Sequence, residues 1–163
     1  MKSLEVEVGF LSDFEVIIWD FDGVIKESVQ VKAEAYAELF HPYGIEVQRK
    51  VREHNQLHGG KSRYEKIPLY FQEYVHRHLS DQEQKEYQLK FQNLVVQQVI
   101  ESKWVPGVQD YLLCNCKIQR FFLLTGTPQE EIEYILYKLG IHSCFIEIMG
   151  APLQKQEGLK HVL

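Results

Sequence analysis

The sequence predicts an α/β fold, in which a parallel sheet with helices on both faces is interrupted by an inserted all-helical segment. Short apolar runs without a helical period occur near residues 15–19, 120–124 and 145–149, and helical patterns follow the second and third. Between the first two runs lies a long stretch, 26–100, with apolar residues at three- and four-residue spacing. A repeated strand–helix order of this kind favours parallel strands joined by crossover helices.

The first expected strand covers residues 15–19. It is short, apolar and rich in β-branched side chains, which is typical of a strand buried on both faces. It stops at residues 20–23, Asp-Phe-Asp-Gly, a sequence typical of a turn.

The inserted stretch reads as several helices. Residues 62–65 and 80–83 each match the capping box, a serine followed three residues later by glutamate. Residues 42–44 and 58–60 contain the glycine and proline that separate helices. The expected apolar stripes are Tyr36, Leu39 and Phe40; Ile67, Tyr70, Phe71, Tyr74 and Val75; and, less regularly, Leu89, Leu94, Val95 and Val99.

After the insertion, a short helix is expected at 108–114, followed by the second strand at 120–124. Thr127 is the expected N-cap of the next helix, with Pro128 at its first position and Glu130 completing a capping box. A third strand at 145–149 and a helix from Lys155 onward complete the pattern.

The composition is that of an ordinary globular protein. Of 163 residues, 45% are hydrophobic and 25% are charged, which excludes a disordered tail, a collagen-like fibre and a coiled coil. The formal net charge of −5 argues against non-specific binding to nucleic acid or to an anionic membrane. Since a membrane-spanning helix needs about 20 consecutive apolar residues, and no such run occurs, we expect no transmembrane segment.

The three cysteines, Cys114, Cys116 and Cys144, cannot all pair with one another. Residues 1–7 carry acidic side chains where a signal peptide has its apolar segment. A reducing, cytoplasmic location is therefore the simplest expectation. For Cys114 and Cys116, structural packing is favoured over a metal or redox role, because no second cluster stands at zinc-ligand spacing.

Polar residues follow each of the three expected strands, at 20–24, 125–127 and 150–155. In open parallel sheets, ligands bind beyond the carboxyl ends of the strands. Asp20 and Asp22 would repel each other unless a divalent cation or a shared proton intervenes. One carboxylate could act as a nucleophile and the other as a general acid and base. Alternatively, the two residues belong to a turn that caps the following helix.

The order of these features resembles the haloacid dehalogenase-like hydrolase superfamily, most closely its phosphatase and phosphomutase branch. The resemblance rests on Asp-Phe-Asp-Gly-Val after a strand, a helical insertion, Thr-Gly-Thr-Pro, and Gly-x-Pro-x-x-Lys. It covers nearly the whole chain. It implies a Rossmann-like parallel core, a helical cap and Mg²⁺ as cofactor.

By position, the resemblance implies that Asp20 is the nucleophile and a magnesium ligand. Asp22 would be the general acid and base, with its backbone carbonyl on the metal. Thr125 would hydrogen-bond the phosphoryl group, and Lys155 would neutralise charge on Asp20 and the phosphate. The backbone N–H groups expected to contact the phosphate belong to Phe21, Asp22 and Gly126. Alternatively, Thr125 is a simple strand-end hydroxyl and Lys155 a solvated lysine near a helix start.

A loop within the insertion, residues 58–63, resembles the Gly-x-Ser-Arg loop that caps of this branch lay over the active site. Lys61 or Arg63 could then hold a second charge on the substrate. The alternative is a flexible turn between helices with solvated basic residues. Lys61 and Lys66 do not match the Schiff-base lysine of phosphonate-cleaving relatives.

One departure concerns the fourth motif of the superfamily, an acidic cluster after a further strand that completes the magnesium site. The sequence ends at Leu163, before any such cluster. The expected domains are a discontinuous catalytic core, 1–25 and 101–163, and a cap, 26–100. The core would hold only 88 residues, so we expect it to be incomplete at its C-terminus.

The predicted function is magnesium-dependent hydrolysis of a small phosphorylated metabolite through an aspartyl-phosphate. A phosphomutase is one alternative. Another is a catalytically inactive or truncated relative that acts as a phosphate-binding or interaction module. The sequence does not indicate an oligomeric state.

Overall fold

The computed structural model describes residues 9–163, and the chain divides into two compact units. The sheet unit combines the described residues up to Glu27 with Lys103–Leu163. The helical unit comprises Ser28–Ser102. The expectation that residues 1–7 do not form a signal peptide lies outside the described residues.

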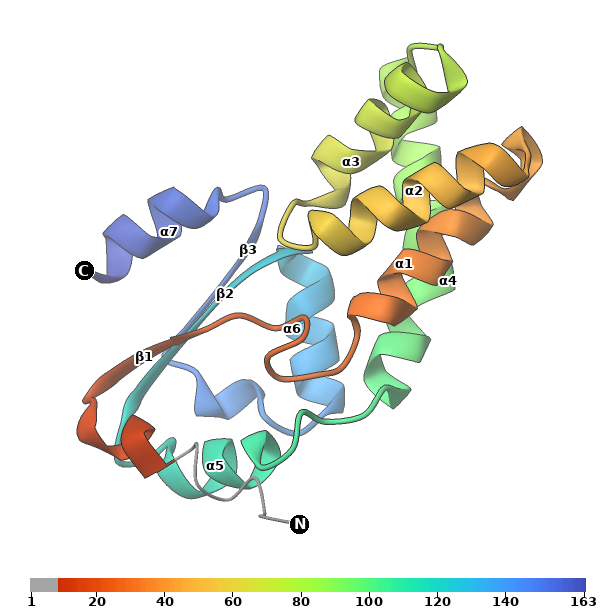
Figure 1. The fold of residues 1–163 in the computed structure, drawn as a ribbon. Coiled ribbons are helices and arrows are strands. Elements are labelled where there is room, and N and C mark those ends of the chain that lie inside the picture. Colours follow the sequence, from red (N-terminus) through yellow and green to blue (C-terminus); the bar gives the residue numbers. More distant parts are fainter. Residues whose placement is uncertain (1–8) are drawn as a thin grey trace. The chain divides into compact units, whose positions relative to one another are not determined.

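The sheet unit contains a three-stranded parallel sheet in the order β1-β2-β3 (Figure 1). The strands are β1 (Val16–Trp19), β2 (Arg120–Pro128) and β3 (Glu147–Ala151). Trp19 pairs with Leu123, and Leu123 with Ile148, so the three strands end at the same edge of the sheet. The shorter elements are the 3-10 turns η2 (Gly9–Asp13) and η5 (His142–Cys144) and the helices α5 (Val108–Asn115), α6 (Gln129–Lys138) and α7 (Lys155–Val162).

Helices cover both faces of this sheet. Neighbouring residues of β2 point to opposite faces, so each of them shows what packs on one side. On one face, Phe122 belongs to an apolar cluster that includes Val162 of α7. On the other face, Phe121 packs edge-on against Trp19, at 5.6 Å between ring centroids, and both rings contact Tyr111 of α5. The predicted α/β class with inserted helices is confirmed.

The helical unit is built around aromatic side chains. Tyr36 of α1 (Val29–Leu39) stacks on Phe91 of α4 (Asp81–Glu101) at 4.0 Å between centroids. Tyr70 of α3 (Arg63–Tyr70) meets Tyr36 and Phe40 edge-on. Phe71 packs against Phe40 at 4.9 Å. The elements of this unit are α1 (Val29–Leu39), η3 (His41–Tyr43), α2 (Ile45–Leu57), α3 (Arg63–Tyr70), the π-helical turn η4 (Phe71–Val75) and α4 (Asp81–Glu101).

Leu89 was expected in the third apolar stripe, but this residue is 58% exposed and does not belong to it. The buried side chains of α4 are Phe91, Val95 and Val99, spaced four residues apart. Leu89 lies two positions before Phe91, which is about 200° around a helix, and therefore faces away from the aromatic core.

The expected helix starts hold only in part. Ser80 forms the predicted capping box, because its Oγ accepts from the Glu83 N–H and its own N–H donates to Glu83 Oε2 at 2.9 Å. Ser62 is the N-cap of α3, but its side chain makes no capping hydrogen bond. Its hydroxyl instead donates to Glu65 Oε1 at 3.5 Å.

The expected N-cap at Thr127 is wrong. Strand β2 continues to Pro128, which pairs with Ala151, and α6 begins at Gln129 without a side-chain cap. Pairing with β3 holds this segment extended past the point where the local pattern favoured a helix. The third strand likewise begins later than expected, at Glu147, because its pairing with β2 starts with Glu147 opposite Phe122.

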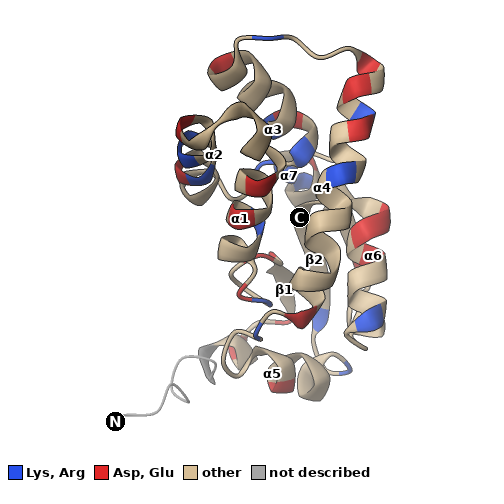
Figure 2. Cartoon of the chain, turned by 90° about the vertical axis from the view of Figure 1, so that its right-hand side faces the viewer, with Lys and Arg blue, Asp and Glu red and all other residues tan. Residues whose placement is uncertain are grey.

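Charged side chains are interleaved along the helices. Figure 2 shows acidic and basic residues mixed on α2, where Arg49 pairs with Glu46 and Glu53, each at 2.7 Å. Arg52 of the same helix binds Glu34 of α1 through two contacts of 2.9 Å. Among the described residues, no helix is both long and apolar enough to cross a membrane.

Candidate active site

The candidate site lies where the three strands of the sheet unit end. Asp20 follows β1 directly, Thr125 and Gly126 lie near the end of β2, and Gly150 lies near the end of β3. Lys155 is the first residue of α7, four residues after β3 ends. The parallel topology therefore brings polar residues from distant parts of the sequence to one sheet edge (Figure 1).

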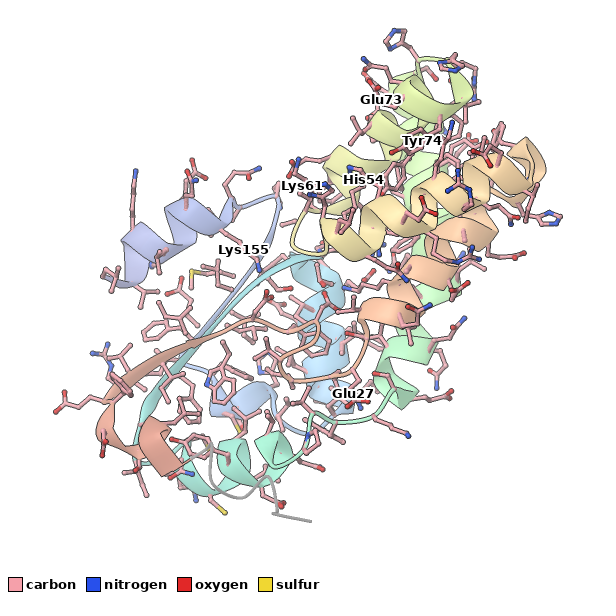
Figure 3. All side chains as sticks on the ribbon, in the orientation of Figure 1. Glu27, His54, Lys61, Glu73, Tyr74 and Lys155 are labelled. Atoms are coloured by element: carbon pink, nitrogen blue, oxygen red, sulfur yellow. The ribbon has the colours of Figure 1, made fainter. Side chains whose placement is uncertain are left out.

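Asp20 and Lys155 form an ion pair across 135 residues of sequence. Lys155 Nζ lies 2.5 Å from Asp20 Oδ2, and each side chain is 36% exposed. Lys155 is labelled in Figure 3. The other carboxylate oxygen, Oδ1, accepts a hydrogen bond from the Phe21 N–H at 2.8 Å. The carboxylate thus has one cationic and one backbone partner, while more than a third of the side chain stays open to solvent.

Asp22 lies on the tight turn that follows Asp20. The Phe21 carbonyl accepts hydrogen bonds from the N–H groups of Ile25 at 2.9 Å and Lys26 at 3.2 Å. Gly23 adopts a φ of 76°, which glycine tolerates without strain, and its N–H donates to the Lys26 carbonyl at 2.8 Å. The Phe21 side chain is fully buried, so it anchors the turn, while Asp22 is half-buried.

Thr125 is completely buried, and its described hydrogen bonds are with Thr127. Thr125 Oγ1 accepts from the Thr127 N–H at 3.2 Å and donates to the Thr127 hydroxyl at 3.4 Å. Gly126, between them, is half-buried. Thr127, expected only as a helix cap, therefore lies in β2 and is the hydrogen-bonding partner of Thr125.

Gln129 is a site-supporting residue that the sequence analysis missed. Its amide Nε2 donates to the Ile148 carbonyl at 2.8 Å, and its Oε1 accepts from the Gly150 N–H at 2.6 Å. The side chain thereby ties the start of α6 to the end of β3, directly before the loop that leads to Lys155. No local sequence signal distinguishes Gln129 from a solvated residue in a first helical turn.

Lys61 and Arg63, the other two expected substrate contacts, belong to the helical unit. Lys61 is exposed in the turn before α3. Arg63 is buried, with its guanidinium 4.8 Å from the centre of the Phe91 ring and Nη1 3.5 Å from the Gln88 carbonyl. Within its own unit, Arg63 therefore packs on the aromatic core. It is not a solvated residue of a flexible turn, which was the alternative expectation.

Lys66 is a second residue of the helical unit whose surroundings the sequence analysis missed. It is buried, its Nζ donates to Asn55 Oδ1 at 2.5 Å, and it lies 5.4 Å from the centre of the Tyr36 ring. Its position three residues after Arg63 and four before Tyr70 places it on the buried stripe of α3. That spacing was a signal available in the sequence.

A divalent cation would find oxygen ligands at Asp20 and Asp22. Carboxylate and carbonyl oxygens are the ligands that Mg²⁺ prefers, and it keeps several water ligands of its own. The donor set at the end of β1 therefore fits magnesium. Within residues 9–163, no group of three or more histidine, cysteine or acidic side chains could by itself hold a metal ion.

The cysteines of the described chain are all free thiols. Cys144 is buried, and this burial together with the neighbouring Cys116 thiol raises its pKa to about 11. A thiol with so high a pKa is a poor nucleophile and metal ligand.

Similar solved structures share this fold. A haloacid dehalogenase-like hydrolase from Streptococcus pneumoniae aligns over 93% of this chain and 70% of its own, with 17% identity and a TM-score of 0.61. The β-phosphoglucomutase of Clostridium difficile aligns over 87% of this chain and 64% of its own, with 23% identity and a TM-score of 0.64.

The CbbY protein of Rhodobacter sphaeroides, solved with xylulose-1,5-bisphosphate, aligns over 86% of this chain and 64% of its own, with 16% identity and a TM-score of 0.64. A comparison with curated proteins gave no match. A family model described as haloacid dehalogenase-like hydrolase matches residues 14–161. Since that match spans nearly the whole chain, the protein belongs to the haloacid dehalogenase-like hydrolase family.

Proposed function

We propose that this protein is a magnesium-dependent phosphatase that acts on a small phosphorylated metabolite. The observation that carries this proposal is the contact between Asp20 and Lys155, in which an ammonium group lies beside a partly exposed carboxylate at a strand end. A carboxylate attacking a phosphate ester is an anion approaching an anion. A fixed positive charge beside it lowers the cost of that approach.

The proposed reaction has two steps. First, an oxygen of Asp20 attacks phosphorus, the bond to the substrate alcohol breaks, and Asp22 donates its proton to the departing oxygen. Second, water attacks the aspartyl-phosphate and gives a proton to Asp22. Inorganic phosphate leaves, and both carboxyl groups return to their starting states.

The remaining residues of the sheet unit stabilise the phosphoryl group in this proposal. The Thr125 hydroxyl and the N–H groups of Phe21 and Gly126 donate to its oxygens, and Lys155 neutralises its charge. The Phe21 N–H donates to Asp20 Oδ1 in this structure, so in the proposal a phosphate oxygen shares or replaces that hydrogen bond. Asp20 and Asp22 would hold Mg²⁺, which supplies further charge neutralisation when bound.

In the same proposal, the helical unit is the cap, and it supplies contacts to the rest of the substrate. Lys61 is exposed and carries a positive charge two residues after Gly59, where nothing lies within 4 Å of a Cβ added to the glycine. Arg63, packed on Phe91, holds the start of α3 in place. The exposed Lys61 thus favours a substrate with a second anionic or polar group, while Arg63 supports the segment that carries it.

One observation favours a second candidate, a phosphate-binding module without turnover. In the described residues, no cluster of three potential metal ligands accompanies Asp20 and Asp22. A site with fewer protein ligands would hold magnesium weakly, and the same residues could then bind phosphate without hydrolysing an ester. A phosphomutase, which returns the phosphoryl group to a sugar, is a further version of the first candidate.

Hydrolysis of p-nitrophenyl phosphate by the full chain, with magnesium or with EDTA, tests the proposal. We expect magnesium-dependent hydrolysis that falls at least about 10³-fold in Asp20→Asn. Asp110→Asn, an exposed carboxylate on α5, is the matched control and should retain activity. Intact-mass measurement should detect a hydroxylamine-sensitive phosphoryl adduct that Asp20→Asn lacks.

The outcomes separate the candidates. Full activity in Asp20→Asn would refute the nucleophile assignment. Binding of inorganic phosphate in calorimetry, without hydrolysis of any phosphate ester, would favour the phosphate-binding module.

A further inference from the structure

Lys26 holds the backbone on both sides of Asp22. Its N–H donates to the carbonyl of Phe21, the residue before Asp22, at 3.2 Å. Its carbonyl accepts from the N–H of Gly23, the residue after Asp22, at 2.8 Å. Residues 22 and 26 also form a bridge of the β type. The orientation of the Asp22 peptide is therefore set by where Lys26 lies.

Lys26 is in turn fixed by the segment that returns from the helical unit. It pairs with Trp104 in an antiparallel bridge. On one side of this bridge, the Val105 N–H donates to the Ile25 carbonyl at 3.1 Å, and on the other the Glu27 N–H donates to the Lys103 carbonyl at 2.8 Å. The chain segments that lead into and out of the helical unit are thus joined next to the Asp22 turn.

The side chains reinforce this junction. Lys26 is only 2% exposed, and its Nζ lies 4.7 Å from the centre of the Trp104 ring, within the range of a cation–π interaction. The side chain of Lys26 therefore ties the Asp22 turn to Trp104 of the returning segment, in addition to the backbone hydrogen bonds.

We propose that Lys26 and Trp104 are positioning residues for Asp22. Their contact locks the two crossing segments together and so holds the Asp22 carboxyl group where it can protonate the departing oxygen. This inference rests on the role of Asp22 in the proposed function. Neither residue touches the substrate or takes up a proton in the reaction.

A series of substrates that differ in their leaving groups tests the inference. A nitrophenolate leaves without protonation, whereas an alkoxide needs the proton of Asp22. We expect Lys26→Met to lower kcat/KM for an alkyl phosphate by about 10- to 100-fold, and kcat/KM for p-nitrophenyl phosphate by no more than about twofold. The ratio kcat/KM covers only the steps up to the aspartyl-phosphate, in which Asp22 acts as the acid. Lys26→Arg, which keeps the cation over the ring, should restore most of the loss.

Three further variants sharpen the test. Trp104→Leu should reproduce the pattern of Lys26→Met, and Trp104→Phe, which keeps an aromatic ring, should be milder. Lys103→Met changes an exposed neighbouring lysine and should leave both substrates unaffected. Equal losses for both leaving groups in Lys26→Met would indicate a merely structural role and overturn the inference, as would full activity on both.

Amide hydrogen exchange provides a readout that does not depend on turnover. Exchange in a peptide spanning residues 21–26 should be about 2- to 30-fold faster in Lys26→Met and Trp104→Leu, the range that a cation–π pair supports. It should be unchanged in Lys103→Met. If the protein hydrolyses no phosphate ester, the proposed function fails, and the exchange result then decides whether the lock exists. Unchanged exchange in both variants would overturn the inference whatever the activity.

Discussion

Replacing Gly150 by alanine tests how closely the end of β3 approaches the start of α6. A Cβ at position 150 would lie 2.7 Å from the Thr127 carbonyl oxygen and 2.8 Å from the Cα and N of Gln129. The shortest of these separations is 0.7 Å less than the 3.4 Å at which ordinary contact begins. All three atoms belong to the backbone, so no side chain can rotate away to make room.

The cost of this substitution follows from the atoms that must move. Overpacking of this kind destabilises by about 1–3 kcal/mol. The shift would also strain the hydrogen bond between the Gly150 N–H and Gln129 Oε1, 2.6 Å long, and losing such a bond costs about 0.5–1.5 kcal/mol. Alanine also lowers the conformational entropy of the unfolded chain, which stabilises the folded protein by about 0.4–1 kcal/mol and offsets part of this loss. We therefore expect the free energy of unfolding to fall by about 2 kcal/mol, within a range of about 0.5–4 kcal/mol.

Urea denaturation followed by circular dichroism and by tryptophan fluorescence measures this change. Gly59→Ala is the matched control, because nothing lies within 4 Å of a Cβ built at that glycine. It should change the free energy of unfolding by less than about 0.5 kcal/mol. Phosphatase activity should fall in Gly150→Ala as well, since the displaced loop carries Lys155. A Gly150→Ala protein as stable as Gly59→Ala would refute the close approach of β3 and α6.

Three other changes probe the helical unit. Ser80→Ala removes the capping box with Glu83 and should destabilise this unit by about 1 kcal/mol in thermal denaturation. Phe91→Ala removes the ring between Tyr36 and Arg63 and should cost about 3–5 kcal/mol in urea denaturation. Burial, and then the positive charges nearby, hold the pKa of His54 below 6.5. As the pH falls, His54 is therefore protonated in the unfolded chain before it is protonated in the folded protein. The free energy of unfolding should therefore fall as the pH drops below 6.5, and His54→Gln should flatten that dependence in urea titrations at several pH values.

Each of these expectations has a result that would contradict it. Unchanged stability in Ser80→Ala would show that the cap hydrogen bonds are replaced by water at no cost. A loss below about 1 kcal/mol in Phe91→Ala would mean that the aromatic core closes over the gap. An equally steep pH dependence in wild type and in His54→Gln would assign the titration to another group.

Much of the fold was predictable because the relevant signals are local. The strand at residues 15–19 and the capping box at Ser80 depend on neighbours within a few positions, and both appear where the patterns indicate. The end of β2 was not predictable in this way. Local preference favoured a helix cap at Thr127, but pairing of Pro128 with Ala151 holds the chain extended, and that partner lies 23 residues away in sequence.

In the candidate site, too, the residue types were predictable from the sequence, whereas the contacts between them were not. The order of the motifs pointed to the family and to Asp20, Asp22, Thr125 and Lys155, because polar residues that follow an expected strand can be recognised in the sequence. The contact between Asp20 and Lys155 joins residues 135 positions apart, and only the parallel pairing of three strands brings them within 2.5 Å. The burial of Lys26 against Trp104 is likewise decided by tertiary structure, because the local sequence around Lys26 does not indicate which distant aromatic ring will pack on it.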